Sequence, residues 1–447
     1  MAGVPVRSGQ SRRTLVAIGV LSLAANLSQA PAAENLATAH AAAHASIRAT
    51  EAGRHVHVLA DDAFEGREGG SRGGRAAGSY IVDQITKLGL EPAGDGGGYF
   101  QSFGGMRNIL AIVRGSDPQL AGELVVVGAH YDHVGYGNSS NSYGPFGYVH
   151  NGADDNASGV AGLIEIAEAL QQLPSRPRRS ILIAFWDGEE KGLLGSRHFL
   201  RVRPEATRDL KTVFSINLDM IGRLRGRRLE VYGVRSAVGL RAAIVAANNS
   251  PLNAAGLELN FDWDISEDSD HYAFLAAGVP TVMLHTGLHD QYHRPSDDAH
   301  LVHLEGIEPV ARLALSLLLT IADEQGPTPV FRPQCRGESN ATRRSLEAVV
   351  VSPVGERRGR WGIGTRHDPG EPTSPVIVRV TPDSPAARGG LVPGDRLVAI
   401  DGVAVAGQDD MVHRLATAPG RVLLDVDRRG RFTQVTLDEA DKKTAGP

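Results

Sequence analysis

Cysteine is almost absent from this sequence, because Cys335 is the only one in 447 residues. An intramolecular disulfide is therefore excluded, and a hydrophobic core or bound metal must hold the fold together. Cys335 lies in a polar segment with nearby prolines, where we expect a free thiol at the surface. No cysteine follows the apolar run near the N-terminus, which excludes a bacterial lipid anchor at that point.

An excess of positive charge is also missing. The formal net charge is −5, and the basic residues are scattered along the chain rather than clustered. This composition gives no overall positive electrostatic potential that would attract nucleic acid or an anionic membrane surface, so nucleic-acid binding is excluded. Hydrophobic residues make up 42% of the chain, which is enough for at least one sizeable core.

A single apolar run precedes the globular part of the chain. Arg12 and Arg13 stand before residues 14–27, "TLVAIGVLSLAANL", and small residues in "SQAPAA" follow as cleavage points. This arrangement is typical of a secretory signal, which we place at residues 1–32, and "SRRTLV" resembles a twin-arginine export signal. The run is too short for a transmembrane helix. We therefore expect an exported protein, periplasmic or secreted, with no membrane span in the mature chain.

Between about residues 46 and 325, apolar runs of strand length alternate with amphipathic runs of helix length. This pattern predicts an α/β sheet with helices on both faces. Val160, Leu163, Ile164 and Ala167 recur at helical spacing, which predicts a helix after Ser158. The last helix of the domain is expected in "IEPVARLALSLLLTIADE". The expected strands are "NILAIVRG", "ELVVVGAH", "SILIAFWD", "VFSINLDM" and "TVMLHT".

The composition changes after this domain, which we place at residues 33–325. Residues 326–344 are polar and break both periodicities, so we interpret them as a linker. A smaller β-rich module follows at residues 345–440. Its short strands are expected in "PVIVRV", "RLVAIDGVAV", "RVLLDVDRRG" and "FTQVTL", with a helix in "QDDMVHRLATA".

Side chains that can bind metal stand at the ends of four expected strands and before the helix that follows Ser158. Singly, each has a structural interpretation, such as an aspartate that caps a helix. In open α/β sheets, however, ligands bind beyond the carboxyl ends of the strands, so these residues converge on one edge. Imidazoles and carboxylates together suit zinc, and more donors are present than one tetrahedral ion needs. The candidates are His130, Asp132, Asp154, Asp155, Glu189, Glu190, Asp219 and His293.

Five motifs in this order, "GAHYDHVG", "NGADDNASG", "WDGEEKGLLGS", "INLDMIG" and "YHRPSDD", resemble the bacterial di-zinc aminopeptidase family. Relatives of that family include glutamate carboxypeptidases and glutaminyl cyclases. The resemblance covers about residues 55–325 and implies a mixed sheet of the zinc-exopeptidase type. It also implies two zinc ions and their ligands: His130 and Asp219 on one ion, Glu190 and His293 on the other, and Asp155 bridging both, with Glu189 as the general base.

The chemistry of such a site agrees with these residue types. A carboxylate that bridges two cations holds them about 3.5–4 Å apart, where they lower the pKa of a shared water toward neutrality and make it the nucleophile. Where a strand gives way to a turn or a helix start, neighbouring side chains diverge by about 100°. Glu190 can then bind a metal while Glu189 takes the proton of the water and passes it to the leaving amine.

Other residues near the motifs are expected to support the site. Asp132 is expected to orient the His130 ring by accepting from its second nitrogen, and Asp297 is a weaker candidate for the same task at His293. Tyr292 is expected to donate a hydrogen bond to the developing oxyanion, with a packing role as the alternative. The segment "SDH" at 269–271 also occurs in the family and is interpreted as supporting the site rather than binding metal. The remaining histidines are interpreted as structural: His133, His285, His289 and His300.

Residues 345–440 resemble a PDZ domain of the kind carried by bacterial envelope proteases. The resemblance rests on "RWGIG" at 360–364, as a carboxylate-binding loop, and on "SPAARGGLVPGDRLVAIDGVAV", as the helix and strand that follow in the permuted bacterial form. An exposed strand edge beside free backbone N–H groups can hold a peptide or a protein C-terminus. A small module that only packs on the catalytic domain is the alternative.

The sequence thus predicts an exported di-zinc metallo-exopeptidase that hydrolyses peptide bonds in peptide substrates. An aminopeptidase that removes N-terminal residues is the preferred interpretation. A carboxypeptidase on acidic dipeptides, a glutaminyl cyclase and a catalytically inactive binding scaffold remain as alternatives. Lost ligands or a lost base would favour the scaffold, and all six positions are present.

Overall fold

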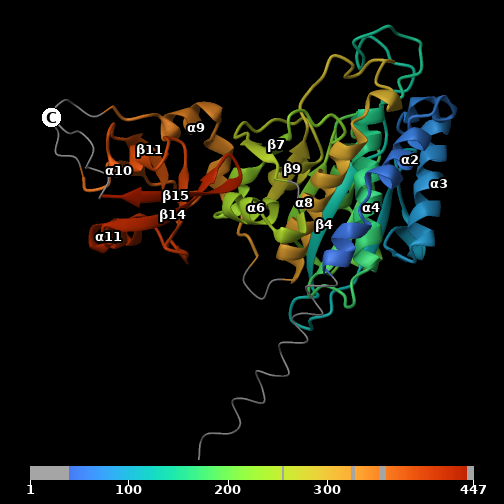
Figure 1. Cartoon of the computed structure of the whole chain (residues 1–447). Helices are drawn as coiled ribbons and strands as arrows, with labels where there is room; N and C mark the ends of the chain where they lie inside the picture. Colours follow the sequence, from blue (N-terminus) through green and yellow to red (C-terminus); the bar gives the residue numbers. More distant parts are fainter. Residues whose placement is uncertain (1–39, 254–255, 324–327, 352–358, 440–447) are drawn as a thin grey trace, which may run out of the picture.

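The computed structural model describes residues 40–253, 256–323, 328–351 and 359–439. The predicted signal peptide, residues 1–32, lies outside these ranges. The described chain forms a nine-stranded sheet and a separate six-stranded sheet, which lie at opposite ends of the molecule in Figure 1. The strands of the larger sheet are β1 (Glu91–Pro92), β2 (Phe100–Phe103), β3 (Met106–Val113), β4 (Glu123–His130), β5 (Ser180–Trp186), β6 (Lys211–Leu218), β7 (Arg228–Tyr232), β8 (Glu258–Phe261) and β9 (Thr281–His285).

Parallel strands form the centre of the larger sheet and antiparallel pairs flank them. The order is β1-β3-β5-β4-β6-β9-β7-β8, with β2 paired to β3. Strands β5, β4, β6 and β9 run parallel, whereas β3 and β7 join them antiparallel. Central parallel strands are buried on both faces and therefore read as continuous apolar runs. The predicted mixed sheet is confirmed, and the five predicted strands are β3, β4, β5, β6 and β9.

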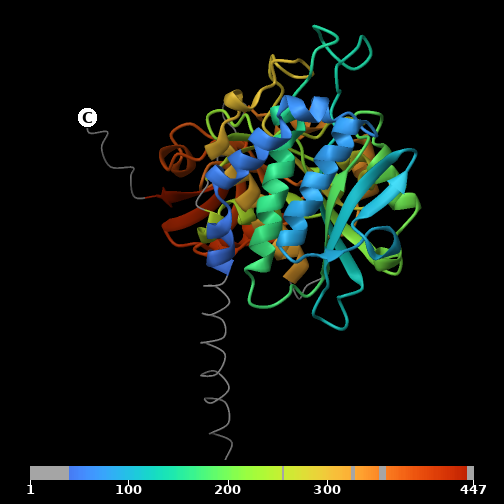
Figure 2. The same ribbon diagram turned by 90° about the vertical axis from the view of Figure 1, so that its right-hand side faces the viewer.

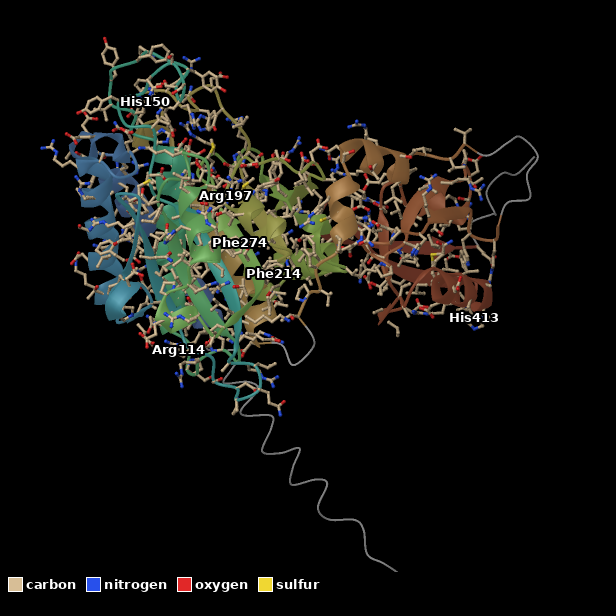
Figure 3. The ribbon with its side chains drawn as sticks, turned by 180° about the vertical axis from the view of Figure 1, so that it is seen from behind. Arg114, His150, Arg197, Phe214, Phe274 and His413 are labelled. Atoms are coloured by element: carbon tan, nitrogen blue, oxygen red, sulfur yellow. The ribbon has the colours of Figure 1, made fainter. Side chains whose placement is uncertain are left out.

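Two apolar cores cover the two faces of this sheet. Val125 and Val127 of β4 contribute to the larger core, and Leu124 and Val126 contribute to the smaller one. Phe214 belongs to the larger core and Phe274 to the smaller, and both are labelled in Figure 3. The larger core is covered by α2 (Ala49–Leu59), α3 (Arg72–Lys87), α4 (Gly159–Gln171), α6 (Leu240–Asn248) and α8 (Leu304–Asp323), and the smaller one by α5 (Leu194–Arg201) and α7 (His271–Ala276).

The helix predicted after Ser158 is α4, and the predicted last helix of the domain is α8. Figure 2 shows α4 lying beside α2 and α3 over one face of the sheet. A single π-type turn, η3 (Ala153–Ser158), precedes α4 and is wholly buried. The other short helical turns are η1 (Asp62–Arg67), η2 (Asp95–Gly97), η4 (Glu205–Thr207), η5 (Val234–Ser236), η6 (Pro251–Asn253), η7 (Ala299–Leu301) and η8 (Pro333–Gly337).

The smaller sheet is antiparallel, in the order β10-β11-β12-β14-β15 with β13 beside β12. Its apolar core gathers residues such as Trp361, Ile377, Leu424 and Leu437, so it forms a unit of its own. This confirms a separate PDZ-like β-rich fold. Its elements are β10 (Ile363–Arg366), β11 (Val376–Val380), α10 (Pro385–Arg388), β12 (Arg396–Ile400), β13 (Val403–Ala404), α11 (Gln408–Thr417), β14 (Arg421–Arg428) and β15 (Arg431–Asp438).

The segment predicted as a linker folds against the first domain over its described part. It contains η8 and the start of α9 (Asn340–Glu347). Glu338 pairs with Arg235, which brings the segment onto the sheet domain, and with Arg332 inside the same segment. Cys335 is fully buried as a result, so the prediction of a surface thiol is wrong. Burial also raises the pKa of this thiol.

Two buried ion pairs connect the domains. Arg241 on α6 pairs with Asp427 on β14 at 2.7 Å, and Arg235 pairs with Asp368 at 2.8 Å. The Glu371 carboxylate accepts the backbone N–H groups of Arg241 and Ala242 at the start of α6. Among the described residues, no helix is long and apolar enough to cross a membrane.

Candidate metal centre

The side chains predicted to bind metal lie together at the carboxyl edge of the parallel strands. His130 is the last residue of β4, and Asp219 directly follows β6. Asp155 lies in η3, which connects to α4, and Glu190 follows β5. His293 comes from the segment after β9. The convergence expected from strand order therefore holds in the structure.

Asp155 lies between two groups of potential ligands. Its Oδ1 is 3.4 Å from His130 Nε2, and its Oδ2 is 3.1 Å from His293 Nε2. His130 Nε2 is also 3.4 Å from Asp219 Oδ1, and His293 Nε2 is 3.2 Å from Glu190 Oε2. The two oxygens of one carboxylate thus face two separate pairs of donors, as a bridging ligand requires.

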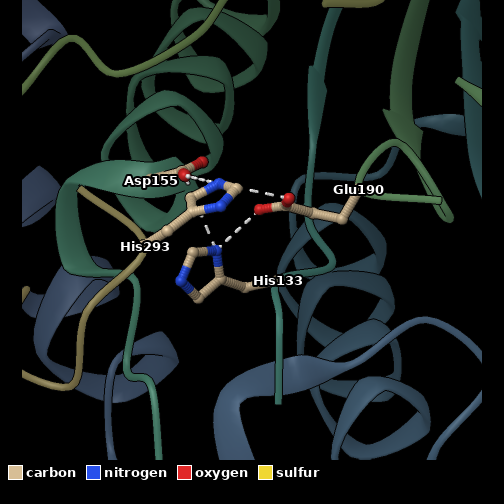
Figure 4. Close-up of side chains that lie close together, drawn as sticks. All are labelled: His133, Asp155, Glu190 and His293. Carbon is tan, nitrogen blue, oxygen red and sulfur yellow. Dashed lines mark hydrogen bonds and ion pairs between the residues drawn. The ribbon is translucent and has the colours of Figure 1, made fainter. Parts of the chain in front are cut away.

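His133 belongs to the second group, although the sequence pattern indicated a structural histidine. Its Nδ1 is 2.8 Å from Glu190 Oε1 and 3.7 Å from Asp155 Oδ2. Figure 4 shows its ring facing Glu190 and His293. The ligand atoms of these four residues lie within 4.8 Å of one another. Its place three residues after His130, past the strand end, was the only sequence signal for this contact.

Glu189 and Glu190 both follow β5 and make partly different contacts. Glu190 faces His133 and His293, and both glutamates also group with His130. The backbone N–H of Glu189 donates to Asp132 Oδ1 at 3.1 Å, which fixes the turn that carries both glutamates.

Three predicted supporting residues take specific positions. Nδ1 of His130 lies 3.2 Å from the backbone oxygen of Asp132 and 3.8 Å from its carboxylate. When Nδ1 carries the proton, Nε2 is unprotonated, and its lone pair is on the side of Asp155 and Asp219. The Tyr292 ring stacks on His293 at 3.9 Å between centroids. Asp297 does not take the expected place beside His293: its Oδ2 accepts the N–H groups of Asp154 and Asp155 instead.

Asp297 and a buried arginine hold the chain on both sides of Asp155. Arg67 is 1% exposed and donates to the carbonyls of Tyr131, Asn151 and Gly152, as well as Leu59. It thus connects the end of β4 to the start of η3. No sequence pattern indicates this role of Arg67, because its partners are backbone carbonyls that carry no residue-specific signal.

The loop at 136–150 holds His293 in place. Figures 1 and 2 show this loop projecting above the sheet beside the segment that follows β9. His293 has φ +50°, a left-handed conformation that is uncommon outside glycine. Its carbonyl accepts from Tyr143 N at 3.1 Å and from Ser142 Oγ at 3.0 Å. Ser142 Oγ also contacts buried His150 Nε2 at 2.6 Å, so a packed side chain fixes the hydroxyl.

The carboxylates of the centre set the protonation of its other groups. Burial raises the pKa of Glu189 well above its ordinary value. For Glu190, burial and the Asp155 charge oppose ionisation, but contacts with His133 and His293 outweigh them and lower its pKa to about 2. Burial opposes charge on His293, yet the neighbouring carboxylates of Asp155 and Glu190 raise its pKa to about 11. The centre therefore requires positive charge.

The residues fit a pair of metal ions. Asp155 Oδ2 is buried 3.1 Å from His293 Nε2 and has no hydrogen-bond partner among the described residues. A buried carboxylate oxygen without a hydrogen bond is suited to bind a cation. Imidazole nitrogens and carboxylate oxygens are the donors that zinc prefers in catalytic sites. Two donor groups share Asp155, one with His130 and Asp219 and one with His133, Glu190 and His293.

Comparison with known proteins agrees with this geometry. Residues 108–318 match the model of peptidase family M28, and residues 376–428 match the PDZ domain. The chain is 25% identical over 225 residues to aminopeptidase YwaD of Bacillus subtilis, covering 49% of this chain and 45% of that protein. It is 30% identical over 185 residues to an aminopeptidase of Pseudomonas aeruginosa, covering 40% of this chain and 31% of that protein.

The matched segment thus spans less than half the length of these two relatives. Among solved structures, the LapA aminopeptidase of Legionella pneumophila superposes with a TM-score of 0.53 at 16% identity, over 64% of this chain and 75% of that one. This likeness concerns the fold.

Proposed function

We propose that this chain, which belongs to peptidase family M28 and carries a PDZ domain, is an exported zinc aminopeptidase. The two relatives described above are named as aminopeptidases, and the motif order in this chain resembles that family. The proposed reaction is the removal of N-terminal residues from peptides.

The observation that carries the proposal is the position of Asp155. Its two oxygens lie 3.4 Å from His130 Nε2 and 3.1 Å from His293 Nε2. A carboxylate in this position supports two metal ions rather than one. We propose that His130 and Asp219 hold the first zinc, that Glu190 and His293 hold the second, and that Asp155 bridges them.

When bound, the zinc ions would polarise the peptide carbonyl and acidify a water molecule. The proposed task of Glu189 is to take the proton of that water on its carboxylate and deliver it to the leaving amine. Its carboxyl is buried, and its backbone is fixed by Asp132. Tyr292, held by its stack on His293, is proposed to donate its hydroxyl to the oxyanion.

Zinc analysis and a substrate panel test the proposal. The mature chain is expected to hold two zinc ions and to hydrolyse aminoacyl p-nitroanilides, and a chelator should abolish both. An acidic dipeptide with a free carboxyl end and an N-terminal glutaminyl peptide complete the panel. Turnover of only one of these would replace the aminopeptidase by a carboxypeptidase or by a cyclase. Turnover of none, in the zinc-loaded chain, would favour a binding scaffold.

Export and a second binding activity are also part of the proposal. The N-terminal residues 1–32 support cleavage of a signal and release to the periplasm or medium, which cell fractionation and N-terminal sequencing of the mature protein would test. The loop at 360–364 lies at the start of β10, an edge strand of its sheet. We propose that a peptide or protein C-terminus adds to this edge.

A further inference from the structure

A cavity of about 820 Å³ lies between the two domains, away from the metal centre. Its walls come from β7, β8, α6 and α9 on one side, and on the other from the loop before β12 and from β14 and β15 with the turn between them. None of the residues at 360–364 lines it, so it is separate from the loop proposed to hold a peptide C-terminus. Its volume is within the range of small-molecule sites.

Arginine is the commonest charged residue on the lining of this cavity. Six arginines and three carboxylates, Glu258, Glu347 and Asp395, line it. Arg343 and Arg428 pair with Glu347 and Asp395 on the lining, and Arg228 and Arg241 pair with Glu230 and Asp427 beside it. The arginines that line the cavity are Arg228, Arg241, Arg343, Arg428, Arg429 and Arg431.

Arg429 and Arg431 are the arginines available to a ligand. Arg431 donates to the backbone carbonyl of Gly256 and pairs with no carboxylate among the described residues. For the exposed Arg429 guanidinium, the described chain offers neither a hydrogen bond nor an ion pair. Arg429 has φ +53° in the turn between β14 and β15, where a glycine or asparagine is the usual choice. The turn itself therefore does not require an arginine.

The backbone of this turn is fastened to the first domain, which holds the arginines over the cavity. The carbonyl of Arg429 accepts from Leu259 N at 2.9 Å, and the carbonyl of Gly430 accepts from Asn248 at 2.8 Å. Gly430 approaches β8 so closely that an added Cβ would lie 2.4 Å from the Leu259 side chain. Figure 1 shows β14 and β15 reaching toward α6 and β7 at this junction.

We propose that the cavity binds a small polyanion that carries two or three phosphate, sulfonate or carboxylate groups. Guanidinium groups bind such oxygens through paired, charge-assisted hydrogen bonds. Arg429 and Arg431, the lining arginines that pair with no carboxylate among the described residues, match this ligand class. Because the ligand touches both domains, its binding stabilises their docking.

Calorimetric titration of the full-length mature protein with a naphthalene trisulfonate tests the proposal. This probe does not compete for zinc, and the corresponding monosulfonate serves as the control ligand. One trisulfonate per chain is expected, with a dissociation constant below about 0.1 mM, a value that rises with salt. Arg429→Gln is expected to weaken binding about tenfold. Arg421→Gln, at an exposed position of β14 outside the cavity, should leave it within about twofold.

The proposal is overturned if the wild type shows no saturable binding, if the monosulfonate binds as tightly, or if Arg429→Gln and Arg421→Gln behave alike. If the trisulfonate binds as expected, titrations with pyrophosphate and with tricarballylate show whether the cavity prefers phosphate or carboxylate groups. Binding of these probes at the metal centre would not respond to Arg429→Gln, which separates the two sites. The result is independent of peptidase activity.

Discussion

At the scale of single residues, the centre depends on neighbours that perform different tasks. Glu189 and Glu190 are adjacent in the chain, yet the pKa of one is raised by burial and that of the other is lowered to about 2. Glu190 faces the imidazoles of His133 and His293, and both glutamates group with His130. A side chain that binds metal and one that carries a proton require these different surroundings.

Glu189→Gln is therefore expected to keep both zinc ions while kcat falls by a factor of about 10²–10⁴, the usual contribution of a general base. Metal content and turnover of an aminoacyl p-nitroanilide, measured on the same sample, check this. Glu190→Gln is the matched comparison and should lose zinc. Equal zinc loss in the two variants would show that the roles are assigned incorrectly.

Ser142→Ala is expected to weaken one of the two zinc sites about tenfold, as removal of a group that orients a ligand does. The hydroxyl supports the carbonyl of His293, whose backbone is left-handed. Zinc per chain, measured against buffered free zinc, should fall from two toward one at a concentration that saturates the wild type. Ser140→Ala is the control, because Ser140 lies in the same loop but its hydroxyl bonds only to Asn138 within the described part of the chain. The same zinc affinity in both variants would rule out this role for Ser142.

Sequence reasoning found the residues whose chemistry is distinctive and missed those that act through the backbone. His130, Asp155 and His293 stand in motifs with metal-binding residue types, and the structure brings them together. Arg67 and Ser142 support the same centre through carbonyl groups. A carbonyl belongs to every residue, so no pattern in the sequence marks such a contact.

At the scale of elements, burial of a charged group on α4 creates a pH dependence. Glu165 is 1% exposed, its Oε2 accepts the backbone N–H of Arg48, and its Oε1 has no partner among the described residues. Burial raises its pKa to about 7. Below about pH 4.5 the carboxyl is protonated in both the folded and unfolded states. Between about pH 4.5 and 7 only the unfolded state ionises, so stability is lost as pH rises.

Glu165→Gln is expected to remove this loss. The variant should be more stable than the wild type by about 1–3 kcal/mol at pH 7.5 and equal to it near pH 4.5. Denaturant unfolding at both pH values measures the difference. A constant offset between the two proteins would show that the pKa of Glu165 is the same in the folded and unfolded states.

Element prediction succeeded where burial gives a continuous signal. Strands β4 and β5 are buried along nearly their whole length and appear in the sequence as apolar runs. Strands β7 and β8 were missed because they have five and four residues, with exposed or half-buried positions at alternating sites. The segment around Cys335 was assigned to a linker because its burial depends on ion pairs between distant residues, such as Arg235 with Glu338.

At the scale of the whole molecule, buried charges hold the domains in one arrangement. Arg241 and Asp427 are 8% and 5% exposed, and the arginine also lies over the Phe261 ring at 4.2 Å. A buried charge that loses its partner costs about 3–5 kcal/mol, whereas an exposed pair contributes about 0–1 kcal/mol. The junction is therefore expected to respond strongly to loss of one partner.

Arg241→Met should lower the thermal midpoint of the full-length protein by several degrees, and Asp427→Asn in the same chain should restore part of it. Arg228→Met is the control, since Arg228 is 62% exposed in its pair with Glu230. Calorimetry of the three variants checks the order. A midpoint for Arg241→Met equal to that of Arg228→Met would mean that this pair does not hold the domains together.

The turn between β14 and β15 also covers the outer edge of β8, the last strand of the larger sheet. β8 ends the strand order, and Leu259 N on that strand donates to the carbonyl of Arg429. An exposed strand edge can pair through its backbone amide groups with another copy of the chain and so promotes aggregation. A chain cut after residue 351 is therefore expected to keep its metal-binding side chains but to self-associate, which light scattering would detect. The PDZ domain would then prevent self-association of the first domain, whether or not the PDZ domain binds a peptide.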